Sequence, residues 1–422
     1  MKLNKLFESK SVVVIDVDEE NSKTYNLSYN LLRNFHGDTY IISAVFSELF
    51  HKQTFESLSE IEDPIDVAII DKPLSELKNV ISECVKRKIK YCILISEIDE
   101  NEKTKEEIKK IKKHFKDKIE IIGPNSIGVY SKDTDFLFFT RKKLPRPIQG
   151  NISIIDQSRT IGPTIFDFMT YEGIGISKYI SIGSEDPTEI LNVLGKDMET
   201  RCIIMYIENI ENGIEFIKVA KKISDKKPIV VLTSEIGTMK SQIYSEAFKK
   251  ANIIETDNIE ELFDYAKTFE KLPLLKHKGI AIVSNTTSLG KICYHNLINS
   301  ELMSADYSKN LLKKIEIQDN IIKMPDEETF EKKINYILKD ESVAGLIFIL
   351  SVYEGKIRPD IIDIMADAKI YGKPIVFVIS KNNFTLLHIK KMQNIGIPVY
   401  ASPQRAVKAM EILWKYSILV HH

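Results

Sequence analysis

The segment GIGISKYISIGSEDPTEILNVLGKDMETRCIIMYIE (Gly173–Glu208) decides the fold class. It contains two short runs rich in β-branched residues, Lys178–Ile182 and Arg201–Ile207, separated by a longer charged amphipathic stretch. Short apolar runs that alternate with helical patterns are typical of βαβ units and a parallel sheet. The segment therefore predicts an α/β fold.

The same alternation extends in both directions along the chain. Further strands are expected at Ser11–Ile15, Thr39–Ser43, Asp66–Ile70, Tyr91–Ser96, Ile119–Ile122, Asn151–Ile155, Pro228–Leu232, Gly279–Ser284, Gly345–Leu350, Pro374–Ile379 and Pro398–Tyr400. Helical patterns such as Leu74–Lys88 and Lys103–Lys116 lie between them, and Lys142–Gly150 has the proline and glycine content of a linker. We predict three consecutive α/β domains, at 1–145, 146–275 and 276–422.

Composition narrows the class of protein. The 422 residues include 59 basic and 60 acidic ones and are 43% hydrophobic. This balance argues against disorder and against a strong electrostatic attraction to nucleic acid or a membrane surface. Four scattered cysteines are expected to be reduced and mostly buried. Without a membrane-length apolar run or a signal-peptide core, we expect a cytoplasmic protein.

Several strings along the chain carry a family resemblance. They are LFESKSVVVI, DPIDVAIIDKP, IGPNSIGV (Ile122–Val129), KKPIVVLTS, AFKKANIIETDNIEELFDYAK, GIAIVSNTTSLG and GIPVYASPQRAVKAM. Together with Gly173–Glu208, and in this order, they resemble the α-chain of nucleoside-diphosphate-forming acyl-CoA synthetases, the superfamily of ADP-forming acetyl-CoA synthetase and the succinyl-CoA synthetase α-chain. The resemblance covers nearly the whole chain.

This resemblance implies a fold and a chemistry. The first domain would be a CoA-binding domain of Rossmann type, and two flavodoxin-like doubly wound domains would follow. Coenzyme A would be the acyl acceptor, and an ATP-grasp β-chain would be the partner that supplies the nucleotide site. A histidine on a mobile loop would carry the phosphoryl group between an acyl phosphate and a nucleoside diphosphate.

The carrier histidine is the first departure from the family pattern. Family members have a Ser-His-Thr-Gly loop after the strand that corresponds to KPIVVL, and this chain has Ser234-Glu235-Ile236-Gly237 in a shorter loop. Glu235 stands where the histidine is expected, and no histidine lies between His114 and His277. Glu208 matches a glutamate that contacts the phosphohistidine in the family, where it would favour the reactive tautomer. A carboxylate can itself form an acyl phosphate, but loss of the phosphoryl relay is the better interpretation.

The phosphate cradle has also changed. Family members read Ser-x-Ser-Gly before a helix whose backbone N–H groups bind phosphate. This chain has DQSRTIG, so Arg159 replaces the glycine and Asp156 adds a negative charge. Ser158 and Thr160 keep their hydroxyl groups, and the guanidinium of Arg159 is able to hold an anion. We assign these last three residues as the candidate anion site.

The expected CoA turn is the third change. VVVI runs into DVDEENSKTYN without a glycine, and four acidic residues stand where the pyrophosphate would lie. Ser22 and Lys23 offer some compensation, and Pro73 and Asn125 match later CoA contacts. The segment Ile41–Glu48 replaces a family stretch that carries a CoA-contacting lysine. CoA binding in the family's pose is therefore expected to be weakened.

These changes favour a diverged α-chain homologue without autonomous ligase activity that binds a ligand or a partner. Two alternatives remain open: an active acid–CoA ligase α-subunit that needs an ATP-grasp β-chain, and a transferase that handles an acyl or carbamoyl phosphate. Coenzyme A is the candidate cofactor, and a homo-oligomer is a further candidate assembly. No GxxxxGK[ST], HExxH or CxxC motif is present, so we expect no metal site on this chain.

Overall fold

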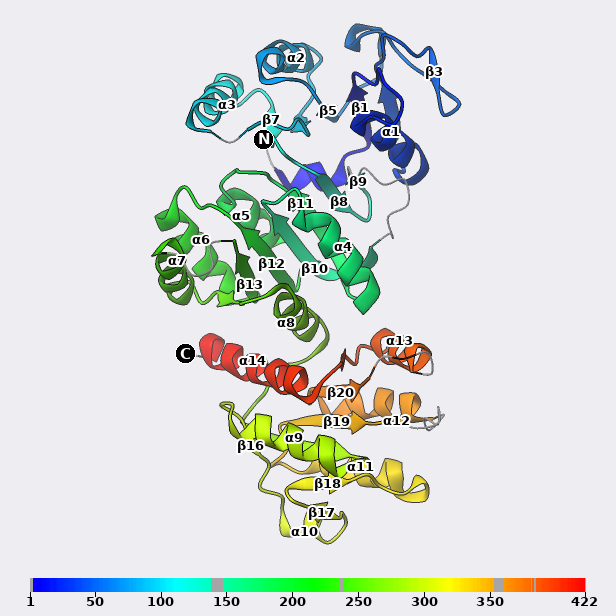
Figure 1. Ribbon diagram of the computed structural model, residues 1–422, viewed down its shortest axis with the longest axis vertical. Helices are drawn as coiled ribbons and strands as arrows, with labels where there is room; N and C mark the ends of the chain where they lie inside the picture. The colour runs from blue at the N-terminus through cyan, green and yellow to red at the C-terminus, as the bar shows by residue number, and fades with distance from the viewer. Residues whose placement is uncertain are drawn as a thin grey trace. The chain divides into compact units, whose positions relative to one another are not determined.

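The computed structural model describes residues 3–99, 101–137, 147–234, 239–352, 360–380, 382 and 385–421. The chain divides into two compact units, Met1–Asp257 and Asn258–His422. Both units are built from mainly parallel sheets flanked by helices, so the predicted α/β class is confirmed (Figure 1). The three domain limits expected from the sequence stay predictions, and residues 138–146 of the expected linker lie outside the described residues.

The first unit begins with a five-stranded parallel sheet of strand order β2-β1-β5-β6-β7. Its strands are β1 (Ser11–Ile15), β2 (Asp38–Ile41), β5 (Val67–Ile70), β6 (Tyr91–Leu94) and β7 (Glu120–Ile122), and its helices are α1 (Lys23–Asn34), α2 (Leu74–Lys86) and α3 (Glu102–Phe115). A small hairpin, β3 (Glu48–Leu49) and β4 (Lys52–Gln53), follows β2. Strands β1, β5 and β6 are buried along their whole length because helices cover both faces of a parallel sheet.

A seven-stranded sheet completes the first unit, in the order β14-β13-β12-β10-β11-β8-β9. Its strands are β8 (Gly128–Ser131), β9 (Asp135–Leu137), β10 (Ile148–Asp156), β11 (Gly175–Ser181), β12 (Cys202–Ile207), β13 (Ile229–Thr233) and β14 (Ile254–Glu255). Its helices are α4 (Ile161–Glu172), α5 (Thr188–Lys196), α6 (Gly213–Ser224) and α7 (Met239–Lys250). Residues 148–150, which the sequence suggested as linker, already belong to β10. One continuous hydrophobic cluster joins this sheet to the first one.

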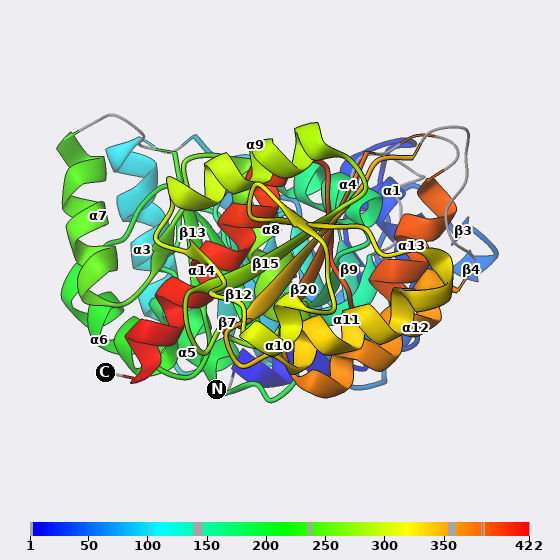
Figure 2. The ribbon, with the colours of Figure 1, turned by 90° about the horizontal axis from the view of Figure 1, so that it is seen from below.

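The second unit contains the third sheet, in the order β17-β18-β15-β19-β20-β21, with β16 paired to β15. Its strands are β15 (Gly279–Ser284), β16 (Met303–Ser304), β17 (Ile317–Gln318), β18 (Ile321–Lys323), β19 (Gly345–Leu350), β20 (Ile375–Ile379) and β21 (Val399–Tyr400). Its helices are α8 (Ile259–Lys271), α9 (Thr287–Ile298), α10 (Lys309–Leu312), α11 (Phe330–Lys339), α12 (Ile361–Ala368), α13 (Leu386–Asn394) and α14 (Pro403–His421). Figure 2 shows α9 and α14 beside strands of this sheet.

Helix α8 is fixed to the third sheet by buried charges. Arg405 on α14 donates two hydrogen bonds to the carboxylate of Asp264, at 2.6 and 2.8 Å. The ammonium group of Lys267 donates to the carbonyl oxygen of Val399 at 3.0 Å. These contacts explain why α8 belongs to the second compact unit although its sequence lies within the predicted middle domain.

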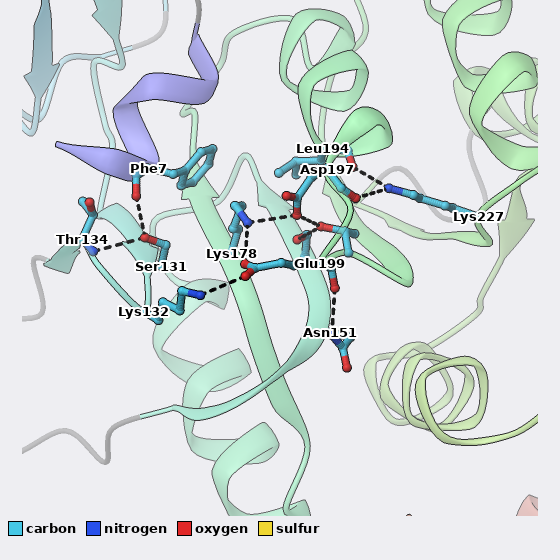
Figure 3. Close-up of polar contacts among 12 residues, drawn as sticks. Phe7, Ser131, Lys132, Thr134, Asn151, Lys178, Leu194, Asp197, Glu199 and Lys227 are labelled. Carbon is cyan, nitrogen blue, oxygen red and sulfur yellow. Dashed lines mark hydrogen bonds and ion pairs between the residues drawn. The ribbon is translucent and has the colours of Figure 1, made fainter.

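A polar network stabilises the amino-terminal end of the second sheet (Figure 3). Lys178 on β11 lies 2.9 Å from a carboxylate oxygen of Asp197 and 3.2 Å from one of Glu199. Glu199 also pairs with Lys132 at 2.9 Å, which ties the β8–β9 hairpin to the loop before β12. Burial raises the pKa of Asp197, but hydrogen bonds from Thr200 and Lys178 outweigh this effect and lower it. The network is structural and lies at the opposite end of the strands from the candidate site.

The cysteines agree with the expectation from the sequence. All four cysteines are free and buried. Burial raises the pKa of the Cys293 thiol to about 12. Among the helices within the described ranges, none combines the length and the apolar character that a bilayer crossing requires.

Candidate functional site

A carboxylate follows each of three neighbouring strands at the carboxyl edge of the first sheet. Asp16 comes directly after β1, Asp71 after β5, and Glu97 shortly after β6. Burial raises the pKa of Asp71, with Glu97 adding to the rise and Lys23 opposing it. Carboxyl ends of parallel strands form the usual ligand edge of such a sheet. This edge is therefore acidic where the family resemblance places the pyrophosphate of CoA.

The acidic turn after β1 is held by bonds within the protein. The ammonium group of Lys72 lies 2.6 Å from a carboxylate oxygen of Asp16. Asp18 accepts hydrogen bonds from the backbone N–H of Ala44 at 2.9 Å and from the hydroxyl of Ser43 at 3.3 Å. Two of the four acidic side chains thus have internal partners. These internal partners reduce the repulsion that the acidic turn exerts on an anion. Lys72, however, is paired with Asp16 and is therefore less available to attract one.

The residues proposed as weak CoA contacts have structural partners. Ser22 caps α1, because its hydroxyl accepts the backbone N–H of Tyr25 at 3.1 Å. Pro73 is the N-cap of α2. Asn125 is 5% exposed, and its amide exchanges two hydrogen bonds with the backbone of Ile98, at 3.0 and 3.1 Å. Asn125 therefore fixes the loop after β6.

The rebuilt phosphate cradle lies at the start of α4. The backbone N–H groups of Thr160 and Ile161 donate to the hydroxyl of Ser158, at 3.3 and 3.4 Å. Asp156 is fully buried and accepts hydrogen bonds from the N–H of Ser158 and the hydroxyl of Tyr179, both at 2.8 Å. The helix terminus is thus partly satisfied by its own serine.

Burial weakens the negative charge that the sequence led us to expect from Asp156 in the cradle. Burial raises its pKa to about 7; the hydrogen bonds from Ser158 and Tyr179 lower it, and the charge of Glu208 raises it. A Cβ at Gly162 would lie 2.5 Å from the hydroxyl of Tyr179 and 2.9 Å from an oxygen of Asp156. Gly162 therefore leaves the space in which these two side chains meet.

Glu97 connects the two sites that the sequence treated separately. Its carboxylate pairs with Lys23 at the start of α1 and lies 3.1 Å from the guanidinium of Arg159 at the start of α4. The hydrogen bond and charge of Lys23, followed by those of Arg159, lower the pKa of Glu97. The structure thus brings Lys23 and Arg159 together, with a carboxylate between them.

Gln157 organises the carboxyl edge of the second sheet. Its amide nitrogen donates to the carbonyl oxygens of Glu185 and Asn209, at 2.7 and 2.8 Å. Its amide oxygen accepts the backbone N–H groups of Glu208 and Asn209, at 2.6 and 2.9 Å. With 4% of its surface exposed, this side chain fixes the backbone that carries Glu208. Sequence reasoning quoted Gln157 inside DQSRTIG but assigned it no role.

A cavity of about 620 Å³ opens beside Gln157 and Glu208. Helix α3, the loop after β11 and the loop after β12 line it. Two ion pairs join α3 to these loops: Lys112 to Glu185 at 2.5 Å, and Lys109 to Glu211 at 3.0 Å. Helix α3, which the sequence indicated only as a helical pattern, therefore also forms one wall of a pocket.

Comparison with known proteins places this geometry in a family. Residues 10–132 match a CoA binding domain, and residues 149–269 match a succinyl-CoA ligase like flavodoxin domain. An ADP-forming acetate–CoA ligase of Methanocaldococcus jannaschii is 29% identical over 97% of this chain. The α-subunit of ADP-forming acetate–CoA ligase I of Pyrococcus furiosus is 27% identical, over 99% of this chain and 98% of its own length. The chain thus has a CoA-binding domain and a succinyl-CoA-ligase-like flavodoxin domain, and over nearly its whole length it is similar to nucleoside-diphosphate-forming acyl-CoA synthetases.

Solved structures show the same fold over the whole chain. A crystal structure of a Pyrococcus horikoshii protein covers the whole of both chains with a TM-score of 0.90 and 25% identity. A dinucleotide-forming acetyl-coenzyme A synthetase of Candidatus Korarchaeum cryptofilum has the same fold, with a TM-score of 0.88 at 23% identity. The chain spans 62% of the length of the M. jannaschii relative and 64% of that of a 4-hydroxybutyrate–CoA ligase of Nitrosopumilus maritimus.

The residues present do not fit CoA in the pose that the superfamily resemblance implies. Lys23, Lys72 and Arg159 each pair with a carboxylate of the protein. Asp16 has a φ of 61° without being a glycine, so its side chain stands in the turn where the backbone would approach a pyrophosphate. Glu235 lies outside the described residues. No cluster of three or more metal-ligating side chains occurs in the part of the chain that the structure describes.

Proposed function

We propose that this chain is a diverged α-chain homologue that binds a ligand or a partner and does not act as an autonomous acyl-CoA ligase. The contact of Glu97 with both Lys23 and Arg159 carries the proposal. An anionic substrate would have to displace this carboxylate before it reached either cation. The absence of a histidine between His114 and His277 supports the same conclusion, since the superfamily's phosphoryl carrier has no equivalent there.

Electrostatics argue against a simple replacement of the phosphoryl relay. Glu208, the partner of the phosphohistidine in the superfamily, lies near Asp156, whose pKa burial raises and Glu208 raises further. A phosphorylated carboxylate at this point would add negative charge to a group of acids. Like charges at close range are mutually destabilising, so a phosphoenzyme would be disfavoured.

A reconstitution assay tests the proposal. The chain is mixed with an ATP-grasp β-chain of the superfamily, CoA, ATP and a panel of short carboxylic acids, and ADP release is followed. The α-subunit of P. furiosus, whose name describes an acetate–CoA ligase subunit, serves as the positive control. We expect no acid-dependent ADP release and no stable phosphorylation of this chain.

The alternatives predict different results. Turnover that is lost in Glu235→Ala but kept in Glu246→Ala, an exposed glutamate on α7, would identify an active α-subunit with a phosphorylated glutamate. Acyl transfer from acetyl phosphate or carbamoyl phosphate without nucleotide would support the transferase alternative. Either result would contradict the proposal.

A further inference from the structure

The cavity beside Gln157 lies at a topological switch point. Strand β10 lies between β11 and β12, so the chain leaves β10 toward one side of the sheet and returns on the other. Gln157 follows β10, Ser184 lies in the loop after β11, and Glu208 follows β12; all three line the cavity. Ligands of open α/β sheets bind in this crevice outside the carboxyl ends of the strands. The position marks a binding site independently of the side chains that line it.

The size and the apolar part of the lining suit a small molecule. The volume of about 620 Å³ lies within the range of about 300–1,000 Å³ that is typical of ligand pockets. Ile98, Ile108, Pro124 and Val219 contribute apolar surface from three different parts of the first unit. A ligand that fills the cavity therefore has an aliphatic or otherwise apolar body.

The charges of the lining select the polar groups of the ligand. Among the described residues that line the cavity are seven carboxylates and three lysines, an excess of four acidic groups. Two of the lysines, Lys109 and Lys112, already pair with lining carboxylates. Burial raises the pKa of Glu189, and the charge of Glu120, which lies outside the lining, raises it further. An anionic ligand such as CoA or an acyl phosphate is repelled here.

The carboxylates come from separate walls of the cavity. Asp99 precedes α3, Glu189 lies in the first turn of α5, Glu208 follows β12, and Glu215 lies in the first turn of α6. A ligand with a single positive charge reaches one wall, whereas a flexible chain with two or more ammonium groups reaches several. Each ammonium group placed against a carboxylate forms a charge-assisted hydrogen bond.

We infer that the cavity between α3 and the switch point of the second sheet binds a small aliphatic di- or polyamine. The inference rests on the proposed function, of which it names the ligand class. The amine's methylene chain packs against the apolar lining, and its ammonium groups pair with carboxylates from different walls. The excess of acidic groups, which disfavours the superfamily's anionic substrates, is then neutralised by the ligand.

Titration calorimetry with the full chain tests the inference. The probes are spermidine and 1,5-diaminopentane, and the comparison compounds are neutral 1,5-pentanediol and anionic glutarate. We expect both amines to bind, spermidine more tightly, and neither comparison compound to bind. Binding should weaken with salt, because ionic strength screens charge pairs.

Variants locate the bound amine. Glu208→Gln and Glu215→Gln should each weaken spermidine binding about tenfold, equal to about 1.4 kcal/mol, by removing one carboxylate partner. Val219→Trp should weaken it at least as much by filling the cavity. The control Glu106→Gln removes an exposed charge from α3 outside the lining, and it should change the affinity less than twofold. Since Glu215 is exposed, its variant folds even if the half-buried Glu208 proves sensitive.

Three results would overturn the inference: no binding of either amine, tighter binding of glutarate than of the amines, or equal weakening by Glu106→Gln and Glu215→Gln. The last result would mean that spermidine is a diffuse counterion of an acidic surface. These outcomes are separate from the fate of the proposed function, which is decided by ADP release in the reconstitution assay. Ligase turnover would contradict the proposed function whether or not an amine binds.

Discussion

Replacement of Gln157 by leucine tests whether one side chain holds the carboxyl edge of the second sheet together. Leucine has a comparable volume but removes four hydrogen bonds to backbone groups of Glu185, Glu208 and Asn209. A typical intramolecular hydrogen bond contributes about 0.5–1.5 kcal/mol net, so four of them correspond to about 2–6 kcal/mol. The upper half of this range applies if water cannot reach the backbone groups that lose their hydrogen bonds to Gln157. The adjoining cavity admits water to some of them, so we expect about 2–4 kcal/mol.

The chain provides its own reporters for this measurement. Cys84 and Cys92 are buried in the first sheet and its helices, Cys202 begins β12, and Cys293 is buried in α9 of the second unit. Pulsed alkylation in increasing urea, followed by peptide mass spectrometry, gives a labelling midpoint for each thiol. Gln157→Leu should lower the midpoint of Cys202 and leave that of Cys293 unchanged.

Two controls separate the hydrogen bonds from other effects. Gln149→Leu changes an exposed glutamine on β10, the strand that Gln157 follows, and should alter the free energy of unfolding reported by Cys202 by less than about 0.5 kcal/mol. Gln157→Glu keeps the acceptor but places a carboxylate oxygen against two carbonyl oxygens, so its folded-state pKa is raised. Its stability should therefore be closest to wild type at low pH and fall as pH rises through that pKa. If Gln157→Leu changes the Cys202 midpoint no more than Gln149→Leu does, Gln157 does not organise this edge.

Three further predictions concern single charges. Asp156→Asn removes a buried carboxyl with a pKa of about 7. Because this pKa is raised above its ordinary value of 3.8, the wild type loses stability as pH rises from 3.8 to 7. Thermal unfolding should therefore show the variant to be more stable than wild type at pH 8 and equally stable below pH 3.8. Lys178→Met removes the cation that pairs with Asp197 and should lower the free energy of unfolding by about 1–3 kcal/mol at pH 7. Because Lys178 helps to lower the pKa of Asp197, and a lowered pKa means that stability is lost as pH falls, the variant should lose less stability than wild type on acidification, as measured by urea unfolding at several pH values. Glu97→Gln frees two cations and should strengthen binding of inorganic phosphate several-fold in titration calorimetry; an unchanged affinity would mean that these cations do not form an anion site.

The fold was predictable because its signal is local. Each buried parallel strand is a short apolar run, so VAII and CILI mark β5 and β6 without reference to a partner strand. The hairpin of β8 and β9 was not predictable in the same way. Its antiparallel pairing with β11 depends on a sheet formed by residues much further along the chain. Local pattern indicates that a strand exists, but not which sheet it joins.

In the candidate site, too, the local sequence does not indicate which distant residues come into contact. Lys23, Ser158 and Arg159 were identified one at a time from departures in motifs. Glu97 lies in no motif, and nothing in its sequence context indicates that it meets cations from the starts of α1 and α4. Gln157 was likewise visible, but its four partners come from two loops that only the folded sheet brings together. Motif comparison finds lost residues and overlooks the contacts that replace them.

The residues that differ from the superfamily pattern share one electrostatic feature, an excess of carboxylates. Where the superfamily's ligand is an anion, the carboxyl edge of the first sheet now carries Asp16 and Glu97, which occupy the available cations. At the neighbouring edge, a cavity of about 620 Å³ has an excess of acidic groups among its described lining residues. Loss of the phosphate ligand alone would require only that cations be removed. Lys23, Lys72 and Arg159 are instead present and paired with carboxylates, and further carboxylates line a cavity of ligand size. This is the arrangement expected of a site for positively charged ligands.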